Sequence, residues 1–90
     1  MTKTDMYLEL FNKYQDKQVI VAIEELSELQ KELCKYQRGD LDINHLTEEI
    51  ADVEIMIEQI KLFFNIDKQL LGQLKQYKLE RTKKRLLKGE

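Results

Sequence analysis

Carboxylates at helical spacing are the residues of this chain whose types and positions can do chemistry. They occur in two stretches, Glu24-Glu25-Leu26-Ser27-Glu28 and Glu49-Ile50-Ala51-Asp52. In each stretch two carboxylates three residues apart project from one helix face, where like charges repel and lower helix stability. A cation between the two pairs would remove that cost, and hard divalent ions prefer carboxylate oxygens. The spacing therefore predicts a Mg2+ site, open also to Mn2+, between two helices, with these ligands: Glu25, Glu28, Glu49 and Asp52.

The composition favours helices as the elements that position these residues. The chain has 90 residues, no Pro or Trp, three Gly and 36% charged residues, which indicates long helices rather than a sheet. The single cysteine, Cys34, excludes an internal disulfide and fits a reducing compartment. No apolar run is long enough for a signal region or a bilayer crossing. We expect one cytoplasmic domain over residues 1–90, with no membrane partner.

Charge is distributed unevenly along the chain. Residues 1–65 carry fourteen acidic and seven basic side chains, a net charge of −7, and residues 66–90 carry three acidic and eight basic ones, a net charge of +5. An acidic body with a basic end suits a metal site that receives a polyphosphate. It suits equally well a basic helix that lies along the acidic surface of its own chain.

Apolar periodicity and capping residues predict four helices, over about 5–14, 17–38, 45–64 and 68–88. Their predicted N-caps are Thr2 or Thr4, Asp16, Asn44 and Asp67, and Gly39 is a predicted C-terminal stop. The short loop after Gly39 makes the second and third helices antiparallel neighbours. At ~1.5 Å per residue, the path from Glu28 through the loop to Glu49 returns both carboxylate pairs to nearly the same level.

Two apolar patterns predict how these helices pack. On the second helix a stripe at intervals of three and four residues predicts a face in the core, made by Val19, Ile23, Leu26, Leu29 or Gln30, Leu33 and Tyr36. The third helix is apolar over most of its circumference, with Ile55 and Leu62 outside its main stripe. A helix of that kind lies at the centre of its assembly. We therefore expect a dimer or a tetramer with these residues at a subunit contact.

The order of the motifs resembles the MazG-like nucleotide pyrophosphohydrolases of the all-α NTP pyrophosphatase superfamily. The matching core spans residues 18–64, and residues 22–29 (AIEELSEL) and 46–53 (LTEEIADV) look like the two family signatures. The resemblance implies an all-α, four-helix subunit with antiparallel central helices, assembled as an oligomeric bundle. It also implies Mg2+-dependent cleavage of an NTP or dNTP to the monophosphate and pyrophosphate. On matching positions it implies Glu25, Glu28, Glu49 and Asp52 as metal ligands, and Glu24 as a catalytic group that orients water or a second metal.

Several further residues have a functional and a structural interpretation. Gln18, two turns before Glu25, could touch a base or ribose, or be a polar residue of the bundle. Glu32 could extend the metal site, although solvation or pairing with Lys35 is favoured. The basic tail is similar to C-terminal helices of small members of the family. Its side chains on one face could grip phosphates or could be solvated: Lys78, Arg81 and Arg85.

Two other functions fit the same motifs. Phosphoribosyl-ATP pyrophosphatase belongs to the same superfamily and shares the acidic motifs, but it usually carries a basic residue where Ala22-Ile23 stands here. A non-catalytic helical interaction module would use the basic tail to bind a partner. Nucleic acid is disfavoured as that partner, because Tyr77 is the only aromatic residue available for base stacking in the tail. Cys34 is predicted to fill the core, and His45, at a helix start, is not expected to bind metal.

Overall fold

Four helices make up the part of the chain that the structure, a computed structural model, describes, which is residues 1–89. They are α1 (Lys3–Tyr14), α2 (Asp16–Gln37), α3 (Ile43–Phe63) and α4 (Lys68–Leu87), and no strand occurs in this range. The prediction of an all-α chain with four helices is confirmed, with helix ends within two residues of the predicted ones. None of these helices combines the length and the apolar content that a bilayer crossing needs.

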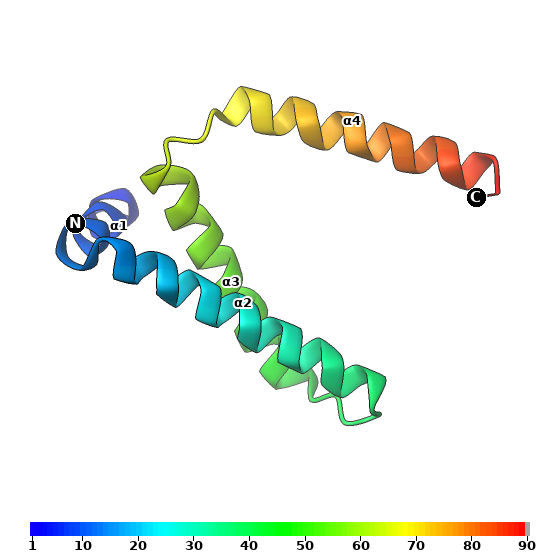
Figure 1. Ribbon diagram of the computed structural model, residues 1–90, viewed down its shortest axis with the longest axis horizontal. Coiled ribbons are helices and arrows are strands. Elements are labelled where there is room, and N and C mark those ends of the chain that lie inside the picture. Colours follow the sequence, from blue (N-terminus) through cyan, green and yellow to red (C-terminus); the bar gives the residue numbers. More distant parts are fainter. Residues whose placement is uncertain (90) are drawn as a thin grey trace.

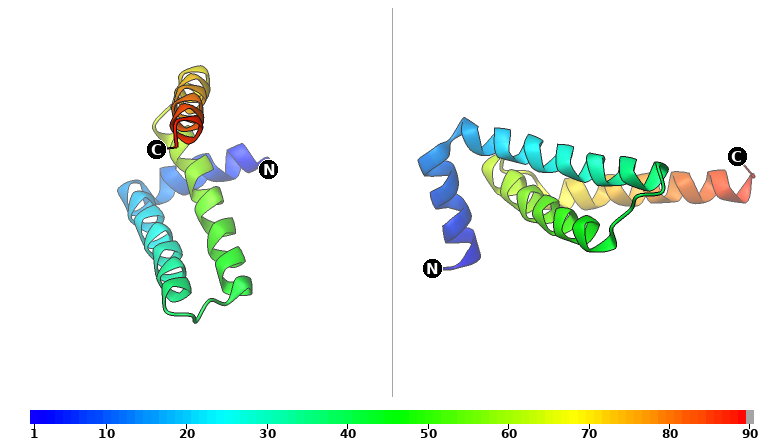
Figure 2. Two further views of the ribbon diagram at one scale, coloured as in Figure 1. Left: turned by 90° about the vertical axis from the view of Figure 1, so that its right-hand side faces the viewer. Right: turned by 90° about the horizontal axis from the view of Figure 1, so that it is seen from below.

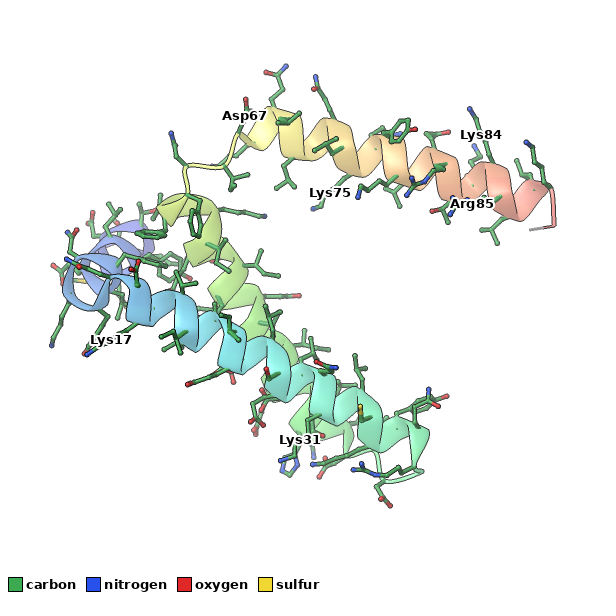
Figure 3. The ribbon with its side chains drawn as sticks, in the orientation of Figure 1. Lys17, Lys31, Asp67, Lys75, Lys84 and Arg85 are labelled. Atoms are coloured by element: carbon green, nitrogen blue, oxygen red, sulfur yellow. The ribbon has the colours of Figure 1, made fainter. Side chains whose placement is uncertain are left out.

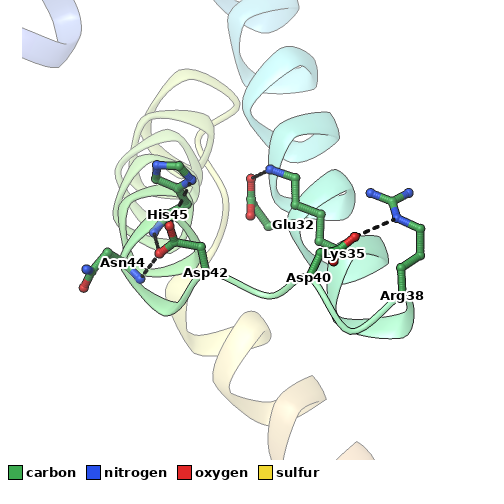
Figure 4. Close-up of polar contacts among 7 residues, drawn as sticks. All are labelled: Glu32, Lys35, Arg38, Asp40, Asp42, Asn44 and His45. Atoms are coloured by element: carbon green, nitrogen blue, oxygen red, sulfur yellow. Dashed lines mark hydrogen bonds and ion pairs between the residues drawn. The ribbon is translucent and has the colours of Figure 1, made fainter.

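The helix starts show which capping predictions were correct. Thr2 caps α1, since its Oγ1 accepts a hydrogen bond from the Asp5 backbone N at 3.0 Å and the Asp5 carboxylate accepts one from the Thr2 backbone N. Asp67 caps α4, as predicted: its Oδ1 accepts hydrogen bonds from the backbone N of Gln69 and of Leu70. Asn44 is wrong as the cap of α3: Asp42 Oδ1 accepts from the backbone N of Asn44 at 2.9 Å (Figure 4). These carboxylate caps satisfy helix N–H groups that have no partner inside the helix.

The predicted cap of α2 is also wrong, because α1 runs into α2 through a single residue. Gln15 is the N-cap, with φ +49° and no hydrogen bond from its side chain, and Asp16 is already helical. At the other end of α2, Gly39 stands at φ +80°, a conformation that L side chains rarely adopt. This glycine lets the chain reverse in a short turn, as predicted from its position after the helix.

The arrangement of the helices centres on α2 and α3, which lie side by side and are joined at one end by the loop after Gly39 (Figures 1 and 2). Near the other end of the pair, α1 packs against both helices. Within residues 1–89, α4 makes no contact with the other three helices, and Figure 1 shows it leaving the end of α3 as a separate arm.

A small core holds α1, α2 and α3 together. Its apolar members are Tyr7, Phe11, Ala22, Val53 and Met56. Phe11 of α1 stacks on Phe63 of α3 with ring centroids 4.2 Å apart. Stacking of this kind stabilises the pair beyond the effect of the area that it buries. Tyr7 donates a hydrogen bond from its hydroxyl to Glu58 Oε2 at 2.9 Å. Gln18 Nε2 of α2 donates to Gln59 Oε1 of α3 at 2.8 Å, and both side chains are buried.

The predicted core stripe of α2 is wrong for most of its residues, although Val19 and Leu29 are half-buried. Ile23 is 57% exposed and Tyr36 is 64% exposed, and Leu26 and Leu33 are also exposed. The residues of α2 that turn toward α3 are Gln18, Ala22, Glu25 and Glu32 instead. Cys34 is exposed as well, so it does not fill the core. Periodicity identifies an apolar face but not what covers it, and α2 uses its more polar face to meet α3.

The dimensions of the chain show how much surface is left uncovered. The Cα radius of gyration is 16.7 Å, against about 12 Å for a compact domain of this length. The accessible surface is 7548 Å², against about 5,500 Å² for a compact monomer of this mass. Apolar side chains contribute to the difference, including Leu70, Leu74 and Leu79 on the separate helix α4.

We predict that Phe11→Ala lowers the free energy of unfolding by about 3–5 kcal/mol, because it removes a buried ring and its stacking contact with Phe63. Phe64→Ala is the matched control, since Phe64 is 55% exposed, and it should have a much smaller effect. Urea unfolding followed by circular dichroism measures both. Equal losses for the two variants would contradict the placement of α1 against α3.

Candidate metal centre

The structure brings three of the predicted ligands together. Carboxylate oxygens of Glu25 from α2, and of Glu49 and Asp52 from α3, all lie within 4.8 Å of one another. We refer to Glu25, Glu49 and Asp52 as the carboxylate cluster. Glu49 and Asp52 are three residues apart and share a face of α3, as the spacing predicted. Glu25 stands one helical turn after Ala22, which is buried in the contact between the helices.

Burial and mutual repulsion act on the cluster in the same direction. Burial, followed by the charges of Asp52, Glu49 and Glu28, raises the pKa of the Glu25 carboxyl above its usual value. Burial and the charge of Asp52 also raise the pKa of Glu49. Both glutamates are half-buried, and Asp52 is exposed. Within residues 1–89, no basic side chain forms an ion pair with any of the three. The cluster therefore concentrates negative charge without an internal counter-charge.

One buried atom of the cluster has no polar partner. Glu49 Oε2 is shielded from solvent and has no hydrogen-bond partner. An orphaned acceptor of this kind destabilises the fold, and more so when it carries charge. A divalent ion between α2 and α3 would satisfy it, and Mg2+ typically takes a few carboxylates and keeps other positions for water and phosphate oxygens. The donor set fits such an ion.

Glu28 and Glu24 are placed differently from the cluster. Glu28 is exposed and is not one of the three grouped carboxylates, although its charge contributes to the raised pKa of both Glu25 and Glu49. It lies near the cluster but does not join it in this conformation. Glu24 is exposed on α2 and is not grouped with the cluster either. Its neighbour Glu25 turns toward α3, and successive helical residues point about 100° apart.

The predicted substrate-binding residues are not beside the cluster in a single chain. Gln18 is buried and its amide donates a hydrogen bond to Gln59. This agrees with its interpretation as a polar residue of the bundle. Lys78, Arg81 and Arg85 lie on α4, which contacts none of α1 to α3 in the described range. Figure 3 shows the α4 side chains, with Arg85 and Lys84 near its far end. Arg81 lies over the ring of Tyr77, with its guanidinium carbon 6.0 Å from the ring centroid.

Glu32 is the residue of this region that sequence reasoning undervalued. It pairs with Lys35, whose Nζ lies 2.9 Å from Glu32 Oε1, as favoured by the spacing. It is also 6% exposed, which a surface pair would not be. Its position in the sequence could have indicated this burial. Glu25, Glu28 and Glu32 follow one another at intervals of three and four residues and share one face of the helix. His45 is exposed, and its Nδ1 lies 3.6 Å from Asp42 Oδ2.

Comparisons of the chain with known protein families, with curated proteins and with solved structures find no match. The two acidic signatures and the geometry of the carboxylate cluster are therefore what can be used to argue a function.

The cluster predicts an unusual pH dependence in a metal-free buffer. Glu25 and Glu49 have raised pKa values in the folded state, so the folded chain binds their protons more tightly than the unfolded chain does. Their contribution to stability is therefore present near the ordinary pKa of 4.5 and is lost as the pH rises through the folded values. We expect the melting temperature to fall as the pH rises above 4.5, and Glu25→Gln to flatten that slope.

Adding Mg2+ at pH 7 should raise the melting temperature, because the ion binds the folded state only. Saturation at ~100 times the dissociation constant adds about 2.7 kcal/mol. Glu54→Gln, an exposed glutamate of α3 outside the cluster, is the control and should keep both effects. A melting temperature that is indifferent to Mg2+ in the wild type would contradict a metal centre at this cluster.

Proposed function

We propose that this chain is a Mg2+-dependent nucleotide pyrophosphohydrolase, a MazG-like enzyme that cleaves an NTP or dNTP to the monophosphate and pyrophosphate. The proposal includes antiparallel central helices and an oligomeric bundle as its active form. The observation that carries it is the carboxylate cluster, because residues from both acidic signatures, Glu25 on one and Glu49 and Asp52 on the other, meet within 4.8 Å.

The chemistry of phosphoanhydride cleavage fits these residues. Glu25, Glu49 and Asp52 would hold Mg2+, with Mn2+ as a substitute, and the ion would lower the pKa of bound water and neutralise phosphate charge. Glu28, whose charge acts on both Glu25 and Glu49, would be the fourth ligand. We assign Glu24, which is exposed and adjacent to Glu25, to orient the attacking water or a second metal.

Self-association is the second part of the proposal. This chain exposes about 2,000 Å² more accessible surface than a compact monomer of its mass. A standard interface buries ~800 Å² of each partner. The outward apolar side chains of α2, such as Ile23 and Tyr36, would be buried by contact with a second copy. The arm α4 is also unpartnered and carries basic side chains, whereas residues 1–65 carry a net charge of −7. Packing of α4 on a second copy would join opposite charges.

Such packing would also complete the substrate site. Lys78, Arg81 and Arg85 do not reach the cluster of their own chain, but α4 of a neighbouring copy could present them to the triphosphate. Arginine and lysine are suited to phosphate oxygens as forked donors and as point charges. In this arrangement the neighbour supplies the phosphate contacts and Gln18 keeps its structural role.

Phosphoribosyl-ATP pyrophosphatase and a non-catalytic interaction module remain the competing functions. The deciding experiment is pyrophosphate release with Mg2+ across a panel of NTPs, dNTPs and phosphoribosyl-ATP. Release from phosphoribosyl-ATP alone would favour the first competitor. No release from any nucleotide, with Mg2+ or Mn2+, would favour the second.

We expect Asp52→Asn to lower kcat/KM by about 10²-fold or more, because it removes a metal ligand without changing the volume of the side chain. Glu54→Gln should keep wild-type kinetics. Asp52→Asn should be at least as stable as the wild type in a metal-free buffer, because it relieves repulsion in the cluster. Full Mg2+-dependent activity of Asp52→Asn would refute the site assignment.

A mixing experiment tests whether α4 acts on the neighbouring copy. Asp52→Asn leaves α4 intact, and the double variant Arg81→Ala with Arg85→Ala leaves the cluster intact. Each should be weakly active alone, since each lost charge-assisted contact costs ~1.5–3 kcal/mol. Subunits mixed after reversible unfolding should regain roughly a quarter of wild-type activity, as expected for a two-fold dimer with one complete site per mixed pair.

Light scattering of the wild type at micromolar concentration should give a dimer or a tetramer. A stable monomer would overturn the assembly. A mixture that stays as inactive as its two components would show that α4 does not serve a neighbouring site.

A further inference from the structure

A pocket between α1, the end of α3 and the start of α4 collects basic side chains. It has a volume of about 380 Å³, which is within the range of pockets that hold small ligands. α1 contributes Lys3 and Tyr7, α3 contributes Glu58 and Lys61, and Lys68 is the first residue of α4. Figure 1 shows α1 beside the end of α3 from which the chain leads to α4.

The carboxylate in this pocket already has partners within the chain. Glu58 Oε2 accepts a hydrogen bond from the Tyr7 hydroxyl at 2.9 Å and lies 3.2 Å from Lys3 Nζ. Both partners lower the pKa of the Glu58 carboxyl, so its negative charge is kept. Within residues 1–89, Lys61 and Lys68 form no ion pair, and Lys61 is half-buried. The pocket therefore holds ammonium groups beyond the one that Glu58 pairs with.

The charge of this pocket is opposite in sign to that of the first 65 residues. Its lining has three lysines and one glutamate, a net charge of +2, whereas residues 1–65 carry −7. Ammonium groups that converge on one space repel one another, and an anion between them removes that cost. Thr4 and Asn65 also line the pocket, and their hydroxyl and amide groups can donate hydrogen bonds to the oxygens of such an anion.

We propose that this pocket binds a small phosphate-bearing anion, held by Lys3, Lys61 and Lys68. The net charge of +2 matches a phosphate dianion, and lysine binds phosphate as a point charge. Lys61 is nine residues after Asp52 on α3, about 13 Å further along the helix axis. Because Mg2+ holds its oxygen ligands at ~2.1 Å, a phosphate group in this pocket does not also coordinate an ion at the carboxylate cluster. The inference goes beyond the proposed function, since it needs neither metal nor hydrolysis.

The same anion would fix the start of α4. In the part of the chain that the structure describes, α4 contacts none of the other three helices. Lys68, in its first turn, nevertheless lines a pocket with residues of α1 and α3. A phosphate group that bridges Lys68 to Lys3 or Lys61 would tie α4 to these helices, so occupancy of the pocket would set the direction in which the arm extends.

Inorganic phosphate, added at constant ionic strength in a metal-free buffer, tests this inference. In an NMR titration of the wild type, the backbone amide signals of Thr4 and Asn65 should shift with one common dissociation constant. The double variant Lys61→Gln with Lys68→Gln should raise that constant by about tenfold or more, because it removes two charge-assisted contacts. Hydrogen exchange of residues 64–70 should slow when phosphate is bound.

Two further variants separate this pocket from a general effect of charge. Lys13→Gln with Lys75→Gln removes the same charge from exposed lysines outside the pocket and should bind phosphate as the wild type does. Glu58→Gln should tighten binding by about threefold or more, since it removes the competing carboxylate but keeps an acceptor for the Tyr7 hydroxyl.

Three results would overturn the inference: no saturable shift in the wild type, unchanged binding by the double variant at 61 and 68, or an equal loss in the control at 13 and 75. Loss of binding in Arg81→Ala with Arg85→Ala would place the anion elsewhere on α4 and would also overturn it. These outcomes are independent of catalysis. A chain that binds phosphate in this pocket but hydrolyses no nucleotide would keep the site and lose the proposed function.

Discussion

Repulsion among carboxylates between α2 and α3 is the constraint on which the rest of the structure depends. Glu25, Glu49 and Asp52 meet within 4.8 Å without an internal counter-charge. Two helices that turn acidic side chains toward each other need attractive contacts elsewhere along their length. The core around Phe11 and Phe63 and the buried amide pair Gln18–Gln59 supply them at one end. At the other end, the turn at Gly39 keeps the helices together through the chain itself.

This arrangement also explains the distribution of apolar surface. Because the face of α2 toward α3 contains Glu25 and Glu32, the larger apolar stripe, with Ile23 and Tyr36, is turned outward. The contact between α2 and α3 thus contains amide and carboxylate side chains as well as apolar ones, and much of the apolar surface of α2 faces outward. The two properties have one origin: α2 turns its acidic face toward α3, so its apolar face is left exposed.

Sequence reasoning could predict the elements and the carboxylate cluster because both depend on local patterns. Helical periodicity, Thr2, Asp67 and Gly39 located the helices, and equal spacing on either side of a short loop brought Glu25 level with Glu49 and Asp52. The inward face of α2 could not be predicted, since an apolar stripe does not state which neighbour covers it. Glu32 was undervalued for a related reason, because spacing to Lys35 predicts a pair but not its burial. The position of α4 could not be predicted either, because in the described residues it makes no contact with α1, α2 or α3.

The amide pair Gln18–Gln59 has a consequence for engineering. Two leucines at these positions would pack well and would stabilise the contact, as apolar replacements of buried polar pairs often do. However, leucines would pack nearly as well after one helix slid by a turn of ~5.4 Å along the other. The hydrogen bond of 2.8 Å between the amides forms in one alignment only. A thermostable redesign of this core would therefore risk losing the alignment that sets Glu25 opposite Asp52, so its success should be judged by whether the carboxylate cluster is kept rather than by melting temperature.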